Sequence, residues 1–409
     1  MKRVFAIALG ILTAIGGFVD IGDLVTNAQV GARFGLSLAW VVVVGVVGIC
    51  VFAEMSGRIA AMSGRATFDL VRERLGPRVG LLNLLGSMSI TFLTFVAEIG
   101  GVALSLQLVS SVHELLIIPL VGLLVWLILW RAKFSAIENI LGLLGLALVA
   151  FAVALWQLGP DWSALAHQAA TVDKPADEQW RTWAYYAVAL FGAAMTPYEV
   201  FFFSSGGVEE KWSEEDIGVM RANVLVGFPL GGLLSLAIAG CTWVVLGPLS
   251  IEVGTLGQVA LPVAVALGKV GLAVVIVGFV AATFGAACET GLSVAYSIAQ
   301  YFGAQWGKYV RVKDAAVFHA IVLLATLLAI AILMTTVDPI LVTEVSVVFS
   351  AVALPLTYFP ILVVANDPDY VGERVNGWFA NTLGTIYLGV IAVAAVSAIP
   401  LMIWTRMGQ

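Results

Sequence analysis

Charged residues are scarce in this sequence, and that scarcity excludes most classes of soluble protein. Only 11% of the 409 residues are charged, 61% are hydrophobic, and the mean hydropathy is +1.03. A soluble domain carries about 25% charged residues. The net charge of −6 offers no basic surface, so we expect no nucleic-acid partner. The composition predicts a multi-pass protein that lies in the lipid bilayer of the cell membrane.

Cysteine and histidine are also sparse. Cys50, Cys241 and Cys288 lie in apolar segments without Cys-x-x-Cys spacing, which predicts neither a disulfide framework nor a zinc site. The three histidines are isolated, and we expect packing or surface roles for them. The sequence has no nucleophile–base pair and no phosphate-binding loop, so we expect neither enzyme activity nor a cofactor.

Long apolar stretches divide the chain into eleven predicted spans of roughly 20 residues or more. They lie near 5–34, 36–54, 80–110, 115–131, 136–158, 182–206, 217–247, 258–303, 315–336, 339–365 and 377–404. The eighth stretch is long enough to include an additional amphipathic piece. The predicted connections are short except at 159–181 and in the basic segment 55–79.

The distribution of lysine and arginine predicts the orientation in the membrane, because cytoplasmic loops collect these residues. With the N-terminus inside, the outer side keeps only Arg33, Lys174, Arg181, Lys269 and Arg406 of the 20 basic residues. All the others fall at the N-terminus or in predicted inner loops. We therefore expect a cytoplasmic N-terminus and an extracellular C-terminus.

Two acids interrupt the first span. Asp20 and Asp23 stand one helical turn apart, and a carboxylate in the bilayer core costs roughly 3 kcal/mol on insertion scales. Glycines at 16, 17 and 22 flank them, which predicts that the helix breaks here and turns its backbone carbonyls inward. A positive charge must offset the two acids. We therefore predict half of a cation site at the membrane midplane, with the freed carbonyl of Gly17 beside the carboxylates.

A second interruption lies in the sixth span. Pro197 removes a backbone donor and frees a carbonyl about one turn earlier, near Ala193, and Glu199 adds another acid. Alone, Pro197 would be equally consistent with a simple kink. Paired with the acidic break five spans earlier, it predicts two inverted five-helix repeats with a site between the breaks. The predicted divisions are a first repeat at 1–158, an extracellular loop at 159–181, a second repeat at 182–365 and an added helix at 366–409.

These two interruptions resemble the natural resistance-associated macrophage protein (Nramp) family of divalent metal transporters. The family carries Asp-Pro-Gly-Asn in its first helix and Met-Pro-His in its sixth, where this chain reads Asp20-Ile21-Gly22-Asp23 and Thr196-Pro197-Tyr198. Shorter matches, among them 97–100 and 290–291, extend the resemblance over nearly the whole chain. The resemblance implies an all-α, LeuT-like core of ten helices with discontinuous first and sixth helices and one added helix.

The departures from the family motifs bear on the choice of ion. Thr196 replaces the methionine and Tyr198 the histidine, which removes two ligands suited to transition metals. Asp23 replaces the asparagine, so carboxylates, hydroxyls and carbonyls remain, the ligands of Mg²⁺, Ca²⁺ or Mn²⁺. A divergent, Nramp-related branch of magnesium transporters also lacks the methionine. The sequence thus predicts transport of Mg²⁺, Mn²⁺ or both, with Asp20, Asp23 and Thr196 as ligands.

Other acids have two interpretations each. We favour a place for Glu199 beside the ion, although it could turn toward a polar core partner. Glu289 is equally consistent with a second ion site against the first helix and with a buried structural role. Glu344 follows the helix start at Asp338-Pro339 by little more than one turn, so a gate or exposed position competes evenly with the pocket.

Proton coupling is doubtful from the sequence. Glu98 keeps a position that belongs to the proton path in the family, but its partner acid is Phe95 here and the motif histidine is Tyr198. No relay that titrates near neutrality remains. We predict uptake driven by the membrane potential, which contributes about 2.3 kcal/mol per charge per 100 mV.

The leading prediction is a monomeric transporter of a hard divalent cation that works by alternating access. The alternative on the same fold is an amino-acid or organic-cation transporter. Asp20 and Asp23 would repel the carboxylate of an amino acid, which disfavours that alternative.

Overall fold

The computed structural model describes residues 18–176 and 178–408, and the regular structure in these ranges is helical throughout. The first predicted span is described only from residue 18 onward, as α2 (Ile21–Phe34). The helices that form the other spans are α3 (Ala39–Ser63), α5 (Pro77–Ser110), α6 (Glu114–Arg131), α7 (Phe134–Gly145), α8 (Ala150–Leu158), α10 (Trp180–Ala194), α11 (Pro197–Glu209), α12 (Ile217–Ala222), α13 (Phe228–Leu246), α14 (Leu256–Phe302), α15 (Ala316–Leu333), α16 (Pro339–Val364) and α18 (Trp378–Trp404).

Within the described ranges, ten helical segments are long and apolar enough to cross a membrane. They correspond to the second through eleventh predicted spans. Three of them join pairs of helices: a short 3₁₀ turn links α7 to α8, residues 195–196 link α10 to α11, and a π-helical turn links α12 to α13. The predicted total of eleven therefore depends partly on residues outside the described ranges.

One predicted connection differs from the structure. The basic segment 55–79 is largely helical, because α3 continues to Ser63 and α4 (Thr67–Leu75) follows. The charge of Arg58 is accommodated because Glu54 on the same helix and the amide oxygen of Asn376 accept hydrogen bonds from it at 3.1 and 2.5 Å. The long eighth stretch, α14, consists of two helices that meet at Gly268, where φ is 64°, in agreement with the additional piece that its length predicts.

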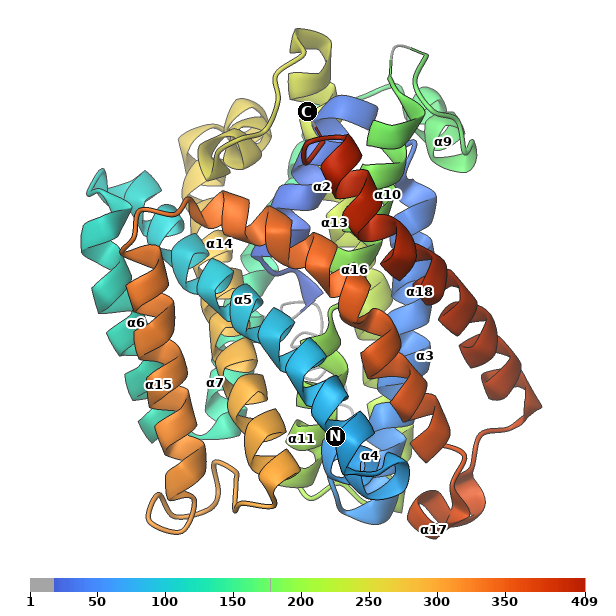
Figure 1. The fold of residues 1–409 in the computed structure, drawn as a ribbon. Helices are drawn as coiled ribbons and strands as arrows, with labels where there is room; N and C mark the ends of the chain where they lie inside the picture. The colour runs from blue at the N-terminus through green and yellow to red at the C-terminus, as the bar shows by residue number, and fades with distance from the viewer. Residues whose placement is uncertain (1–17, 177, 409) are drawn as a thin grey trace.

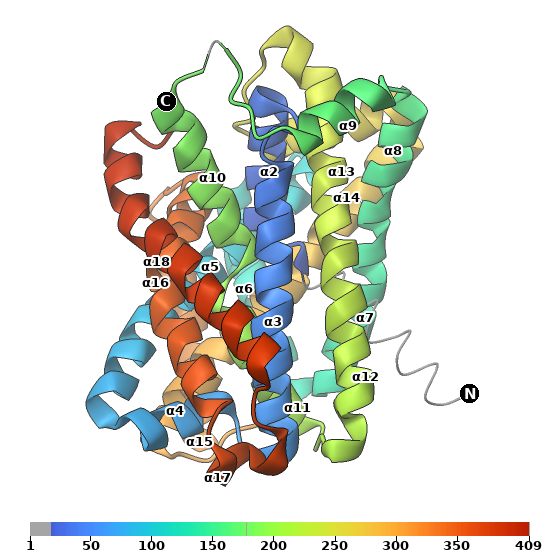
Figure 2. The ribbon, with the colours of Figure 1, turned by 90° about the vertical axis from the view of Figure 1, so that its right-hand side faces the viewer.

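The helices run between two ends of the molecule. The C-terminus and α9 (Trp162–Ala170) lie at the top of Figure 1, and α4 and α17 (Pro368–Val371) lie at the bottom. We refer to these as the α9 end and the α4 end. In a view turned by 90°, α3 and α13 run side by side between the two ends, with α18 crossing in front (Figure 2).

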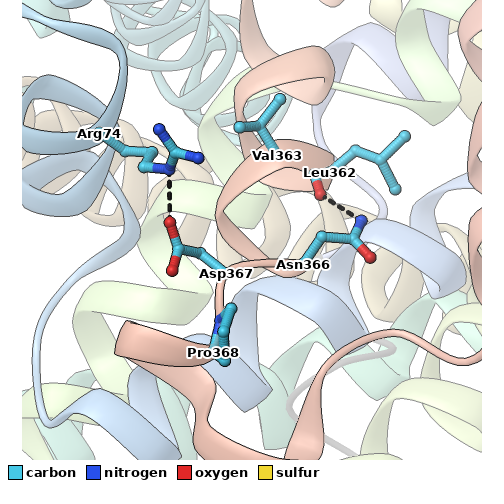
Figure 3. Close-up of a pocket in the computed structure, with 6 residues that line it drawn as sticks. All are labelled: Arg74, Leu362, Val363, Asn366, Asp367 and Pro368. Atoms are coloured by element: carbon cyan, nitrogen blue, oxygen red, sulfur yellow. Dashed lines mark hydrogen bonds and ion pairs between the residues drawn. The ribbon is translucent and has the colours of Figure 1, made fainter.

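Ion pairs bind the loops of the α4 end to one another. Arg374 pairs with Glu214 at 2.8 Å, and Arg74 pairs with Asp367. A cavity of about 420 Å³ opens beside the second pair, with Arg74 pointing toward Asp367 and Asn366 turned back to the carbonyl of Leu362 (Figure 3). This cavity lies at the end of α16, away from both helix interruptions.

Two glycines allow the helices around the interruptions to approach closely. A Cβ on Gly31 of α2 would lie 2.3 Å from the backbone oxygen of Ala239 in α13, and one on Gly192 of α10 would lie 2.2 Å from the oxygen of Val347 in α16. Small residues at such crossings are typical of helix packing in membranes. These contacts place α2 and α10 in fixed positions against α13 and α16.

Candidate metal centre at the two helix interruptions

Within the described residues, a helix starts at the interruption that the sequence predicts in the first span. Residues 19 and 20 are not helical, and α2 begins at Ile21 with Asp20 as its N-cap. The Oδ1 atom of Asp20 accepts a hydrogen bond from the backbone N–H of Asp23 at 2.8 Å. Aspartate is among the preferred N-cap residues, and its negative charge lies at the positive end of the helix dipole. The acid that the sequence marked as costly is therefore also the residue that starts the helix.

Asp23 lies in the first turn of α2, and both of its carboxylate oxygens have partners. Asn27 donates its side-chain N–H to Oδ1 at 2.8 Å, and the hydroxyl of Ser235, on α13, donates to Oδ2. Asn27 also bonds the backbone oxygen of Asp23 at 2.9 Å. Sequence reasoning assigned no role to either partner. Ser235 is an ordinary small residue in an apolar helix, and only its hydrogen bond, 212 positions from Asp23, reveals its place.

The sixth helix is discontinuous as predicted. The first part, α10, ends at Ala194, and α11 starts at Pro197 with Thr196 as its extended N-cap. Proline is favoured at the first helical position because its missing N–H has no intrahelical partner there. Ala193 lies in the last turn of α10, where backbone carbonyls lack intrahelical partners. Two residues later, the backbone carbonyl of Met195 accepts a hydrogen bond from the hydroxyl of Tyr358 at 3.2 Å.

The two interruptions face each other in the interior. The hydroxyl of Tyr198, at the start of α11, donates to Oδ2 of Asp20 at 3.3 Å. Thr196 and Glu199 are also buried, at 2% and 8% exposure. The Thr196 hydroxyl lies beside the Glu199 carboxylate but outside hydrogen-bonding geometry, so it and one Glu199 oxygen have no hydrogen-bond partner in the described structure. Buried polar atoms of this kind are available to an ion.

Glu98 approaches the same place from α5. Its Oε1 accepts the backbone N–H of Ile21 at 3.1 Å, and its other oxygen is buried without a partner among the described residues. Glu98 thus contacts the backbone next to Asp20, at the positive end of α2. Glu289, on α14, is partly exposed and lies near enough to Asp20 for their charges to interact.

One predicted residue lies elsewhere in the structure, and another, Gly17, lies outside the described residues. Glu344 is not at the interruptions: it accepts a hydrogen bond at 2.6 Å from Gln29, nine residues along α2 from Asp20, or about 13 Å at 1.5 Å per residue. The gate-like interpretation of Glu344 therefore agrees better with its position than a place beside Asp20.

Sulfur is directed away from the interruptions. Met195 immediately precedes Thr196, so its thioether could in principle have replaced the missing motif methionine. Its sulfur instead packs against Gly48 of α3, where an added Cβ would lie 2.6 Å away, and near Tyr387 of α18. Around the two interruptions the described side chains offer carboxylate and hydroxyl oxygens and the amide oxygen of Asn27.

Carboxylates alone do not form a complete metal shell here. Within residues 18–176 and 178–408, no three His, Cys, Asp or Glu side chains gather in a group that could hold a metal ion. A cation at this place would therefore draw on hydroxyl and carbonyl oxygens or on water as well. Mg²⁺ is usually held in this way, by one or two carboxylates and several retained waters.

Comparison with protein families identifies one that covers the chain. The model of the Nramp family, described as natural resistance-associated macrophage protein-like, matches residues 10–400. Among curated proteins, the divalent metal cation transporter MntH of Erwinia tasmaniensis is 25% identical over 405 residues, 95% of this chain and 93% of that protein. The MntH of Deinococcus radiodurans is 27% identical over 239 residues, a match that spans about half of each chain, 55% and 53%.

Two solved structures share the arrangement of helices. The manganese transporter of Eremococcus coleocola superposes with a TM-score of 0.71 at 16% identity, covering 98% of this chain and 94% of that one. Mhp1, a nucleobase-cation-symport-1 family transporter, gives a TM-score of 0.63 at 14% identity over 97% and 92% of the two chains. At such identities the likeness shows the fold alone. It confirms the predicted LeuT-like fold.

Proposed function

Since this chain belongs to the Nramp family, we propose that it transports a divalent metal cation across the membrane, and specifically a hard one, Mg²⁺ or Mn²⁺. The observation that carries the proposal is the meeting of two interrupted helices over two buried aspartates in an environment of oxygen atoms. Transporters with such interrupted helices bind their substrate at the membrane midplane and alternate between access from either side. The protein acts as a carrier, not as an enzyme.

In the proposed site Asp20 and Asp23 supply the charge. The Oδ2 atom of Asp20 is more available than either carboxylate oxygen of Asp23, because among the described residues its one printed hydrogen bond is the long one from Tyr198. Thr196 and Glu199 contribute the oxygens that have no partner in the described structure. The carbonyls of Gly17 and Ala193 complete the shell with water, and Tyr198, Glu98 and Glu289 surround it without coordinating the ion. No resident cofactor takes part.

We further propose that transport is not coupled to protons. Tyr198 keeps its hydroxyl proton at physiological pH, and Phe95 cannot carry one. Glu98 is engaged with the backbone of Ile21, which gives it a structural task at the start of α2. The membrane potential and the cation gradient then drive uptake.

The orientation follows from the basic loops. The connections between α3 and α5, α6 and α7, α14 and α15, and α16 and α18 gather at the α4 end (Figure 1). These connections and the helix ends that border them hold ten of the 20 lysine and arginine residues, namely Arg65, Arg72, Arg74, Arg78, Arg131, Lys133, Lys308, Arg311, Lys313 and Arg374. We therefore propose that the α4 end is cytoplasmic and that α9 and the C-terminus are extracellular. We also propose that the protein works as a monomer in the cell membrane.

Selectivity in proteoliposomes tests the proposed function. Purified protein should take up Mg²⁺ and Mn²⁺, with no preference for soft Cd²⁺ and no uptake of amino acids. Thr196→Met introduces a thioether beside Asp20 and should shift the preference toward Cd²⁺ or Mn²⁺ relative to Mg²⁺.

The matched control is Thr385→Met, which makes the same change at an exposed position of α18. An unchanged selectivity ratio in Thr196→Met would remove Thr196 from the ligand shell. Uptake of amino acids without any uptake of divalent cations would refute the proposed function itself.

A further inference from the structure

A second polar pocket lies between the helix interruptions and the α9 end. Thr26 and Gln29 of α2, Tyr185 and Tyr186 of α10, and Glu344 of α16 give it five oxygen-bearing side chains. The pocket has a volume of about 10 Å³, which is room for roughly one water molecule or one ion. The proposed metal site uses none of these residues.

The amide nitrogen of Gln29 lies between two oxygen atoms that could instead bind a cation. This Nε2 atom donates to Oε1 of Glu344 at 2.6 Å and to the backbone oxygen of Val253 at 3.2 Å. One donor group thus joins two oxygens from separate parts of the chain, a helix and the loop before α14. The two ends of a glutamine amide have nearly the same shape, so a rotation of about 180° would exchange this donor for an acceptor oxygen.

The pocket adjoins the route to the aspartates. Gln29, Thr26 and Asp23 follow one another on α2 at intervals of three residues, or about 4.5 Å along the helix axis for each step. The basic side chain on the next turn, Arg33, does not oppose a cation at Glu344, because Glu178 pairs with it at 2.5 Å.

We propose that Glu344, Gln29 and the Val253 carbonyl form a transient site for the transported divalent cation on its way to Asp20 and Asp23. This inference rests on the proposed function. Without a cation, the Gln29 amide satisfies both oxygens. With a cation, the amide turns its oxygen inward, so that a carboxylate, an amide and a carbonyl oxygen hold the ion together with the Thr26 hydroxyl. These are hard ligands with a single negative charge, which suits a site that must release its ion.

Glu344→Gln tests this site, because it removes the charge and keeps the shape of the side chain. Loss of the local attraction should raise the KM of Mn²⁺ uptake in proteoliposomes by about tenfold, with the maximal rate retained. The matched control is Asp173→Asn, which removes an exposed acid of the loop that follows α9 and should leave KM unchanged. If Glu344→Gln does not assemble, Gln29→Leu removes the rotating amide and should give the same rise.

Direct binding separates this inference from the proposed function. Mn²⁺ titrated into Asp20→Asn should still show weak binding, and that binding should vanish in the double variant Asp20→Asn/Glu344→Gln. A KM for Glu344→Gln equal to that of the unaltered protein, or weak binding that persists in the double variant, would overturn the Glu344 site. Failure of the unaltered protein to take up any divalent cation would instead overturn the proposed function.

Discussion

Replacing Asp20 with asparagine separates the two tasks that this residue has in the structure. Asparagine caps a helix about as well as aspartate, so the hydrogen bond to the backbone N–H of Asp23 should survive and α2 should still start at Ile21. What is lost is one negative charge next to the proposed ion. Any change in cation binding then reports on charge and not on the fold of the interruption.

The expected loss is large. Coulomb's law with an effective dielectric constant of about 20 gives about 8 kcal/mol between a divalent cation and one carboxylate about 4 Å away. A neutral amide has a smaller desolvation cost than a carboxylate, which offsets about half of the lost attraction. The net loss of binding free energy is then about 4 kcal/mol, or roughly a thousandfold in Kd. Mn²⁺ affinity, measured by calorimetry on purified protein, should fall accordingly, and uptake should cease.

The control is Asp161→Asn, the same substitution at another helix start. Asp161 caps α9, where its carboxylate accepts the N–H of Ser163 at 2.9 Å, and it is exposed at the α9 end. Its replacement should leave Mn²⁺ affinity unchanged. If Asp20→Asn bound Mn²⁺ as tightly as Asp161→Asn does, the site would have to lie elsewhere.

Three further outcomes follow from the same structure. Ser235→Ala removes a hydrogen bond to Asp23, and loss of such an orienting partner should weaken Mn²⁺ binding about 10–100-fold in calorimetry, whereas no change would show that Ser235 does not position Asp23. A pH dye inside liposomes should report no Mn²⁺-dependent acidification, and acidification that is lost in Glu98→Gln while binding persists would reveal a proton path. Burial raises the pKa of Asp69 on α4 from 3.8 to about 6, although the charges of Arg65 and Arg72 oppose this shift. The folded protein therefore binds this proton more tightly than the unfolded chain does, and its free energy of unfolding falls as the pH rises from about 4 to about 6. Asp69→Asn should therefore raise the unfolding midpoint at pH 7 and flatten its dependence between about pH 4 and 6, and an unchanged profile would contradict the assignment.

The two interruptions could be predicted from the sequence because each leaves a local mark. Acids next to glycines in an apolar span have a high insertion free energy, which predicts a functional role for them. Pro197 lacks the backbone N–H that would continue a helix. The structure shows a helix start after Asp20 and a break between Ala194 and Pro197, and the pairing of the two interruptions predicted the fold.

The hydrogen-bond partners of the aspartates cannot be recognised from the sequence around them. Ser235 reaches Asp23 from α13, and nothing near Ser235 in the sequence distinguishes it from other small polar residues of the membrane helices. The direction of a side chain around its helix axis is also invisible locally. Met195 turns toward α3, while its neighbour Thr196 is at the break.

Glu344 shows the same limit for an acid that the sequence did single out. Its two interpretations were balanced because its place along α16 was known and its partner was not. The hydrogen bond to Gln29 resolves the position and directs the residue to a second pocket. A contact between residues 315 positions apart depends on how α2 and α16 pack, and Gly22 of α2, where an added Cβ would lie 2.8 Å from a side-chain carbon of Val347, contributes to that packing.

Anomalous diffraction from crystals grown with Mn²⁺ would test the central claim most directly. The account predicts a peak within coordination distance of the Asp20 and Asp23 carboxylates and close to Thr196, and it predicts that Asp20→Asn crystals grown under the same conditions lack this peak. A Mn²⁺ peak remote from both aspartates, or one at the interruptions that persists unchanged in Asp20→Asn, would contradict the account.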